Sequence, residues 1–236
     1  VIESERPGAG GSGFPASLVT PRLDAGDGDI AALHAQALTR AANLYAAIPG
    51  AVIAEGVLQL EQAPRDAVRF ARVAVQPIWA EGAMEVRDPV ACADRLGEPV
   101  GSGGLWMRDA MAIHPAAVLE AWLTEADRIT ATVGRLAAVD GGWRLLDDGG
   151  ASIHEADIVV VAGGWGTAGL VPTLPLAPVR GQAHWVEGVE AGPVAWGGYA
   201  APTGSGLLSG ATHDRGETDG GPSEGAGARN LATVAE

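Results

Sequence analysis

The sequence predicts a mixed α/β protein, and three observations support this class. Residues 29–48 carry apolar side chains at helical spacing and are followed by a Pro-Gly stop signal. Residues 129–154 contain short stretches in which apolar and polar positions alternate, as in antiparallel strands. Residues 157–162 form a continuous, largely β-branched run that ends in two glycines, which is typical of a parallel strand buried on both faces.

The remaining elements follow in chain order from the same rules. Helices are predicted from Pro64 and from Pro115, because proline suits the first turn of a helix. Residues 76–103 mix proline, glycine and charge and receive no assignment. Short strands are predicted at 56–60, 183–186, 194–199 and 207–210, and a turn-rich tail at 216–227.

Length and composition restrict the class of protein. The 236 residues suffice for one large domain or two interleaved ones, and 47% hydrophobic with 19% charged residues indicates a globular core. No apolar run reaches transmembrane length, and no basic leader opens the chain, so we expect a cytoplasmic protein with no membrane partner. The single cysteine, Cys92, excludes an internal disulfide and is expected to be a small buried hydrophobe.

The charge of the chain limits the kinds of nucleic-acid partner that it can bind. The net charge is −14 and all 15 basic residues are arginine. Such a chain is a poor candidate for nonspecific nucleic-acid binding, although a local arginine patch or a basic domain outside this chain remains open. The five histidines lack metal-ligand spacing, so no metal site is predicted.

A G-x-G-x-x-G match at residues 8–13 needs a context that this chain does not provide. In a dinucleotide-binding turn the first glycine follows a buried strand directly and a helix follows the last one. Here five residues separate Gly8 from the Val1-Ile2 strand remnant, and Phe14-Pro15 follows Gly13. We therefore expect a glycine-rich loop here, and a true fingerprint about 20–30 residues before Glu3 in a longer protein.

Several segments, in chain order, carry a family resemblance. They are Val1-Ile2-Glu3, Gly10-Gly11-Ser12-Gly13, the stretch around Val133, Ala162-Gly163-Gly164, Pro178-Val179-Arg180-Gly181-Gln182 and Gly197-Gly198-Tyr199. In this order they resemble the FAD-dependent amine oxidoreductases of the D-amino-acid oxidase and glycine oxidase superfamily. Within it, the chain looks most like the C-terminal oxidoreductase domain of bifunctional bacterial enzymes that modify the wobble uridine of tRNA.

The resemblance implies a specific architecture. It is a Rossmann-like FAD-binding domain, here without its first βα unit, interleaved with a substrate domain built on a mixed or antiparallel sheet. The expected boundaries are 1–55, 101–172 and 205–236 for the FAD-binding domain, and 56–100 and 173–204 for the substrate domain.

The resemblance also implies cofactor-binding residues. Glu3 accepts hydrogen bonds from the adenosine ribose, Ser12 and Gly13 lie near the pyrophosphate or flavin, and Val133 offers its backbone to adenine. Purely structural roles for these residues remain open as alternatives. Glu3 is then a solvated acid at the end of a strand, and the glycines form a surface turn. The other implied cofactor-binding residues are Ala16, Ala162, Gly163, Gly164 and Gly181.

Arg180 and Tyr199 are the implied catalytic residues. Arg180 stabilises the reduced anionic flavin or pairs with a substrate carboxylate, and Tyr199 hydrogen-bonds the substrate. A salt-bridged arginine and an interfacial tyrosine are the open alternatives.

The implied reaction is oxidation of a C–N bond, which removes the carboxymethyl group from carboxymethylaminomethyl-uridine in tRNA. A methyltransferase domain linked outside this chain is expected with it. One alternative is a stand-alone oxidase or dehydrogenase for glycine, sarcosine, a D-amino acid or another small amino-acid-like amine. The other is a truncated, cofactor-free domain with a structural or tRNA-binding role.

Overall fold

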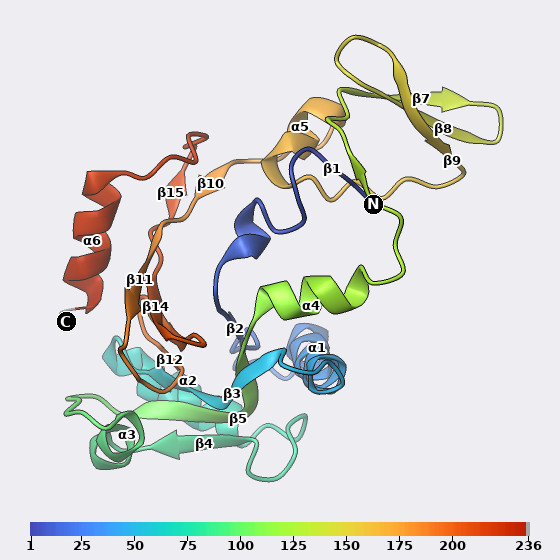
Figure 1. Ribbon diagram of the computed structural model, residues 1–236. Helices are drawn as coiled ribbons and strands as arrows, with labels where there is room; N and C mark the ends of the chain where they lie inside the picture. Colours follow the sequence, from blue (N-terminus) through green and yellow to red (C-terminus); the bar gives the residue numbers. More distant parts are fainter. Residues whose placement is uncertain (235–236) are drawn as a thin grey trace. The chain divides into compact units, whose positions relative to one another are not determined.

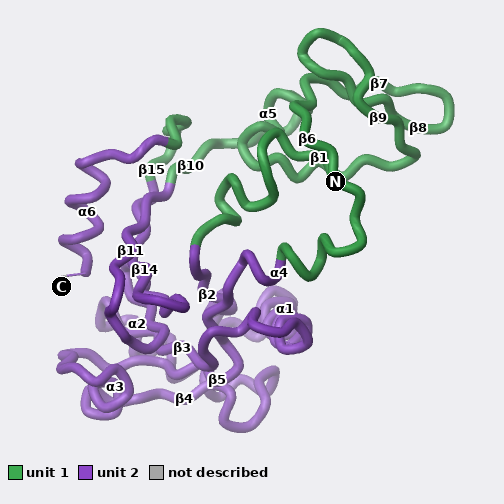
Figure 2. Tube along the Cα trace, in the orientation of Figure 1, with its two compact units in different colours: residues 1–14, 119–180, 214–220 green, residues 15–118, 181–213, 221–236 purple. Residues whose placement is uncertain are grey.

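The computed structural model describes residues 1–234 and contains two compact units (Figure 2). The larger unit comprises Pro15–Val118, Gly181–His213 and Gly221–Glu236, and the smaller comprises Val1–Phe14, Leu119–Arg180 and Asp214–Gly220. These divisions differ from the predicted boundaries, because 15–55 and 101–118 belong to the larger unit. Of the predicted segment 205–236, Ala235 and Glu236 lie outside the described residues.

The larger unit is built on one curled, mixed sheet (Figure 1). Its strand order is β11-β14-β13-β12-β3-β5-β2, with β4 also paired to β5, and only the β12–β3 pair is parallel. Its strands are β2 (Ser17–Val19), β3 (Val52–Leu60), β4 (Met84–Arg87), β5 (Gly104–Ile113), β11 (Ala183–Glu187), β12 (Val194–Ala195), β13 (Tyr199–Pro202) and β14 (Gly206–Gly210).

Helices complete this unit. They are α1 (Asp29–Ala46), α2 (Pro64–Ala74), α3 (Pro89–Leu96), α4 (Pro115–Trp122), whose second half falls in the smaller unit, and α6 (Glu224–Val234). Those that begin at residues 29, 64 and 115 lie where the sequence predicts them, whereas the helix that begins at residue 224 starts within the predicted turn-rich tail 216–227. The unassigned stretch 76–103 contains β4 and α3, whose N-cap is Asp88. The carboxylate of Asp88 accepts the Ala91 N–H at 2.8 Å, which is ordinary capping chemistry.

The core of the larger unit lies where α1 and α2 pack on β3, β4 and β5. Phe70 of α2 is fully buried against Val57, Leu105 and Met107. A second cluster, on Leu58, surrounds Cys92. Cys92 is buried and unbonded to any other cysteine, which confirms the prediction, and burial raises the pKa of its thiol.

The smaller unit has shorter elements. Strand β1 (Ile2–Glu3) pairs in parallel with β6 (Ile129–Thr130), and β10 (Val179–Arg180) pairs antiparallel with β15 (Asp214–Arg215). An antiparallel meander follows the predicted alternation: β7 (Arg135–Val139), β8 (Gly142–Leu146) and β9 (Ser152–Ala156). The short helical turns are η1 (Gly11–Gly13), η2 (Gly164–Gly166) and α5 (Thr167–Leu170).

The predicted buried strand at 157–162 is wrong for this structure. These residues form no strand, and Ile158 and Val160 are 81% and 85% exposed. A β-strand needs a neighbouring strand for its backbone hydrogen bonds, and this segment pairs with none among residues 1–234. The predicted strand 129–133 is also shorter than expected, so that Val133 lies in the connection between β6 and β7.

Candidate functional site

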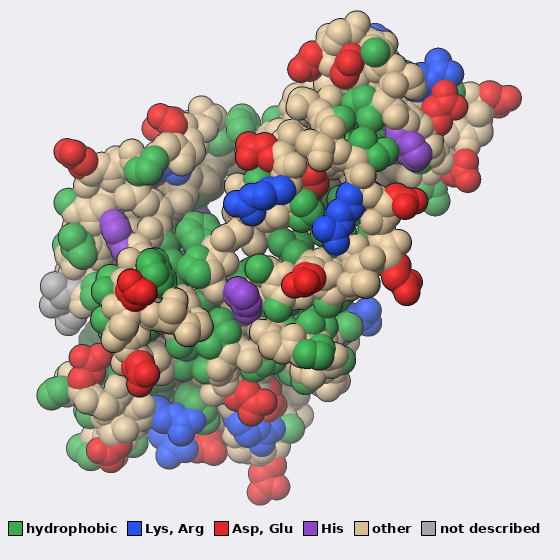
Figure 3. All heavy atoms as spheres, in the orientation of Figure 1, with side chains coloured by type: hydrophobic (Ala, Val, Ile, Leu, Met, Phe, Trp, Pro, Cys, Tyr) green, Lys and Arg blue, Asp and Glu red, His purple; other side chains and the backbone are tan. Residues whose placement is uncertain are grey.

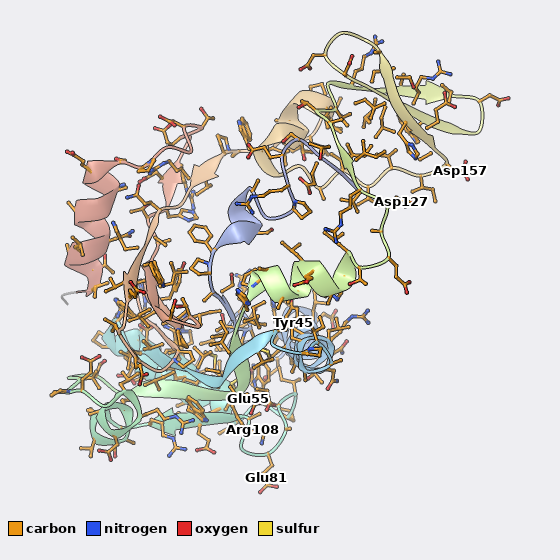
Figure 4. The ribbon with its side chains drawn as sticks, viewed as in Figure 1. Tyr45, Glu55, Glu81, Arg108, Asp127 and Asp157 are labelled. Atoms are coloured by element: carbon orange, nitrogen blue, oxygen red, sulfur yellow. The ribbon has the colours of Figure 1, made fainter. Side chains whose placement is uncertain are left out.

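The β1–β6 pair brings two predicted cofactor-binding residues to the same sheet edge. Glu3 is paired with Thr130, and the Ala131 N–H donates to the Glu3 carbonyl at 2.9 Å. The amino group of Val1 donates to the carbonyl of Asp127, which Figure 4 labels, at 2.6 Å. Because the strands are parallel, the exposed Glu3 at the end of β1 and Val133 in the connection after β6 both belong to the carboxyl-terminal side of a strand, where open α/β sheets bind ligands.

The glycine-rich loop after β1 closes tightly on itself. The Gly13 N–H donates to the Gly10 carbonyl at 3.0 Å. An ideal Cβ on Gly13 would lie 1.9 Å from the Gly8 carbonyl oxygen, so no residue with a side chain fits there without a shift. Gly10 and Gly11 face open space, and Ser12 is exposed. The loop therefore presents backbone and a hydroxyl group without side chains in the way.

The second glycine pair begins a helical turn. Ala162, Gly163 and Gly164 are exposed, and Gly164 has a φ of +55°, a conformation that favours glycine. Gly164 opens η2, which continues into α5. Like Glu3, Ser12, Gly13 and Val133, these residues belong to the smaller unit.

Arg180 is held by a carboxylate in the β10–β15 pair. Its register partner is Asp214, and the guanidinium Nη1 lies 3.5 Å from the Asp214 carboxylate. The arginine side chain is only 9% exposed, whereas Asp214 is 31% exposed. Sequence reasoning did not find Asp214, because two-residue strands 34 positions apart leave no periodic signal in the sequence.

The remaining predicted residues belong to the larger unit. Ala16 is buried in a cluster with Ala201 and Leu208, and Tyr199 of β13 packs against the same cluster. Burial raises the pKa of the Tyr199 hydroxyl. Gly181 follows β10, and a Cβ there would lie 3.3 Å from the Thr212 carbonyl oxygen. The structure thus brings Ala16 and Tyr199 together.

Residues 1–234 contain neither a metal-binding cluster nor a membrane-spanning helix. No group of His, Cys, Asp and Glu side chains in this part is arranged to hold a metal ion. No helix in the same range is long and apolar enough to cross a membrane.

Comparison with models of protein families shows which family the chain belongs to. A model of the FAD-dependent oxidoreductases, abbreviated DAO, matches residues 1–236. The chain belongs to this family. The family's cofactor is FAD, which accepts a hydride from substrate when bound.

Curated relatives match most of the chain. It is 50% identical over 227 residues to the "tRNA 5-methylaminomethyl-2-thiouridine biosynthesis bifunctional protein MnmC" of Caulobacter sp. (strain K31), covering 95% of this chain. The protein of the same name from Maricaulis maris is 34% identical over 237 residues, covering 100% of the chain. In both cases the match covers 37% of the relative, so the chain spans little more than a third of these proteins.

Solved structures confirm the fold. Glycine oxidase from Geobacillus kaustophilus superposes with a TM-score of 0.73 at 21% identity, covering 99% of this chain and 70% of the other. The L-alpha-glycerophosphate oxidase from Mycoplasma pneumoniae, with FAD bound, superposes with a TM-score of 0.75 at 14% identity, covering 99% and 70%. The mixed α/β class and the interleaving of two parts are those expected from the sequence.

The residues of the smaller unit fit parts of a dinucleotide. A carboxylate accepts hydrogen bonds from ribose hydroxyls, and Glu3 is an exposed carboxylate at the end of a parallel strand. The open backbone at Gly10 and Gly11 and the side-chain-free position at Gly13 allow close approach of a pyrophosphate. This chemistry of donors and acceptors is compatible with FAD.

Proposed function

We propose that the protein containing this chain oxidises a C–N bond of a secondary amine, with the carboxymethylaminomethyl group of tRNA wobble uridine as substrate. The observation that carries this proposal is 50% identity over 95% of the chain to a protein named for 5-methylaminomethyl-2-thiouridine biosynthesis. The name "bifunctional" and the 37% coverage support a second domain elsewhere in the protein, to which we assign a methyltransferase activity. A cytoplasmic location belongs to the same proposal.

We assign FAD binding mainly to the smaller unit and substrate binding to the larger one. Glu3 holds the ribose, Ser12 and Gly13 lie at the pyrophosphate or flavin, and Val133 meets adenine through its backbone. Ala162, Gly163 and Gly164 complete this part of the site. Ala16 and Gly181, which belong to the larger unit, stay predicted cofactor-binding residues. The support is the shared sheet edge of β1 and β6 and the glycine geometry.

Arg180 and Tyr199 have complementary roles in this proposal. Arg180 holds a substrate carboxylate or the negative charge of the reduced cofactor, while Asp214 orients its guanidinium, which has five N–H donors. Tyr199 donates a hydrogen bond from its hydroxyl group to the substrate. Its raised pKa keeps the hydroxyl proton in place at neutral pH.

The exposed run 157–162 supports a strand contributed by residues outside this chain. Ile158 and Val160 are exposed, and Val159 and Val161 are half-buried. Such a run suits the interior of a parallel sheet. We propose that the βα unit carrying the G-x-G-x-x-G turn supplies the pairing strand.

Mass spectrometry of tRNA nucleosides tests the proposal. The full-length protein is incubated with tRNA that carries carboxymethylaminomethyl-uridine, and loss of the carboxymethyl group is the expected result. A protein that leaves this tRNA unchanged but oxidises glycine or sarcosine is instead an amino-acid oxidase. The absence of a flavin absorbance spectrum in the purified full-length protein contradicts both enzymatic proposals.

A further inference from the structure

A pocket in the larger unit shares no lining residue with the site assigned above. It has a volume of about 310 Å³ and is formed by β3, the end of β4, α3 and β5. Its lining residues are Leu58, Arg87, Ala91, Asp94, Arg95 and Trp106. Figure 3 shows basic side chains on the surface over α3 and β4, with acidic side chains beside them. The volume is within the range of small-ligand sites.

Trp106 holds Arg95 in position. The Trp106 ring occupies the space above Gly56, where a Cβ would lie 1.9 Å from the ring and where φ is +78°. The Arg95 guanidinium carbon lies 3.4 Å from the centre of the Trp106 ring. A guanidinium stacked on an indole keeps its in-plane N–H donors for other partners. Among residues 1–234, no hydrogen bond or ion pair joins the Arg95 side chain to another residue.

Arg87 adds a second guanidinium to the same pocket. Its side chain is paired with Glu85 on the same strand, and both side chains are more than two-fifths exposed. A single partner leaves most of the five N–H donors of Arg87 available. Two guanidiniums on one pocket suit a phosphate or carboxylate, which they bind through parallel hydrogen bonds.

Asp94 narrows the ligand class. A carboxylate in the lining repels a ligand with several negative charges, and it accepts a hydrogen bond from a hydroxyl group. A ribonucleotide within an RNA chain has both required features, because its phosphodiester carries one negative charge and its ribose carries a 2′-hydroxyl. The 2′-hydroxyl is also the group that distinguishes RNA from DNA.

We propose that this pocket binds one ribonucleotide unit of an RNA substrate, with the phosphodiester on Arg95 and Arg87 and the 2′-hydroxyl on Asp94. The inference rests on the proposed tRNA function and names a contact for it. Because Asp94 and Glu85 offset the charge of the two guanidiniums, the pocket offers directed N–H donors for a phosphate rather than a net positive charge.

The test is tRNA binding by the full-length, FAD-loaded protein, measured by fluorescence anisotropy at several salt concentrations. Arg95→Gln is expected to weaken binding about tenfold and to reduce the salt slope by about one. Arg40→Gln, at an exposed arginine of α1 in the same unit, is the matched control and is expected to stay within twofold. Asp94→Asn is expected to reduce the preference for an RNA anticodon stem–loop over its DNA counterpart.

The outcomes separate the pocket from the proposed function. If wild type binds tRNA and Arg95→Gln binds it equally well, the pocket proposal is overturned and the proposed function stands. Equal losses in Arg95→Gln and Arg40→Gln also overturn it, because diffuse charge then explains binding. Failure of the wild type to bind tRNA overturns both proposals. If uridine monophosphate binds the pocket without displacing tRNA, the ligand is a free nucleotide and the RNA proposal is overturned.

Discussion

The two units differ in how completely their strands are paired and covered. In the larger unit, eight strands share one sheet, and α1 and α2 pack on it so that Phe70 of α2 and Leu105 of β5 are buried together. In the smaller unit, β1, β6, β10 and β15 are two residues long. Of its described hydrophobic side chains, Leu145 and Leu146 of the meander are the buried ones.

This difference shows whether each unit finds its strand partners and its core within this chain. The larger unit finds its hydrogen-bond partners and its core within the 236 residues. The smaller unit leaves Ile158 and Val160 exposed in a run whose composition suits a buried strand. Stability and cofactor binding should therefore respond differently to changes in the two units.

The largest expected effect is on the core of the larger unit. Phe70→Ala should lower the free energy of unfolding by about 3–5 kcal/mol, because it removes a fully buried aromatic ring and leaves a cavity. Denaturant unfolding followed by circular dichroism measures this. Ile158→Ala is the matched change at an exposed position and should cost less than about 0.5 kcal/mol. Equal losses of unfolding free energy in the two variants would contradict the proposed difference in packing between the two units.

A carboxylate introduced into the exposed run 157–162 tests whether this run is buried in the full-length protein. Val160→Asp should be nearly neutral in the 236-residue chain, since the side chain is 85% exposed. In the full-length protein it should destabilise by about 2–3 kcal/mol, because a paired, covered strand would bury the carboxylate. Unfolding curves of the two proteins with and without the substitution provide the measurement. A neutral effect in the full-length protein would rule out the proposed neighbouring strand.

Arg180→Lys should lower amine oxidation in the full-length protein by one to two orders of magnitude. This corresponds to about 1.4–2.8 kcal/mol of transition-state stabilisation, lost because lysine lacks the planar fork of five donors. Anaerobic flavin reduction by substrate in a stopped-flow instrument is the measurement. Arg135→Lys, at an exposed position of β7, is the control and should change nothing.

A substitution at Asp214 separates a role of Arg180 in flavin reduction from a role in holding β10 and β15 together. Asp214→Asn removes the charge that faces the guanidinium. If both substitutions lower stability equally and leave the reduction rate within twofold, Arg180 serves only to join β10 and β15.

The smallest expected effect is the pH dependence due to Tyr199. Burial raises its folded-state pKa above the ordinary value of 10.0. Its contribution to stability is therefore fully present below pH 10.0 and is lost as the pH rises through the folded-state pKa. Tyr199→Phe should remove this part of the alkaline decline in unfolding free energy, whereas Tyr45→Phe should retain it. An unchanged decline in Tyr199→Phe would show that other groups cause it.

Much of the larger unit was predictable because its signals are local. The apolar spacing of 29–48 and the prolines at 64 and 115 predicted α1, α2 and α4, and the helices form there. The stretch 76–103 gave no such signal, because β4 is four residues long and α3 eight. Pairing with β5 and packing of Cys92 stabilise these short elements, and neither interaction is local in sequence.

The sequence predicted which residues belong to the candidate site, but it did not predict which of them contact one another. The motif order pointed to the FAD-dependent oxidoreductase family, to which the chain belongs. The sequence did not show that Asp214 faces Arg180 or that Ala16 and Tyr199 share a cluster. The roles of these residues stay predictions.

The sequence by itself determined the class of fold and the periodic helices, because these depend on residue type and near-neighbour spacing. The order of its motifs resembled that of the family to which the chain belongs. Only the tertiary structure decided which strands pair with one another and which polar groups meet. The run 157–162 has the composition of a strand but forms none, because a strand depends on a partner that composition does not specify. The Arg180–Asp214 and Arg95–Trp106 contacts likewise follow from sheet register and helix docking, which bring residues together across the chain.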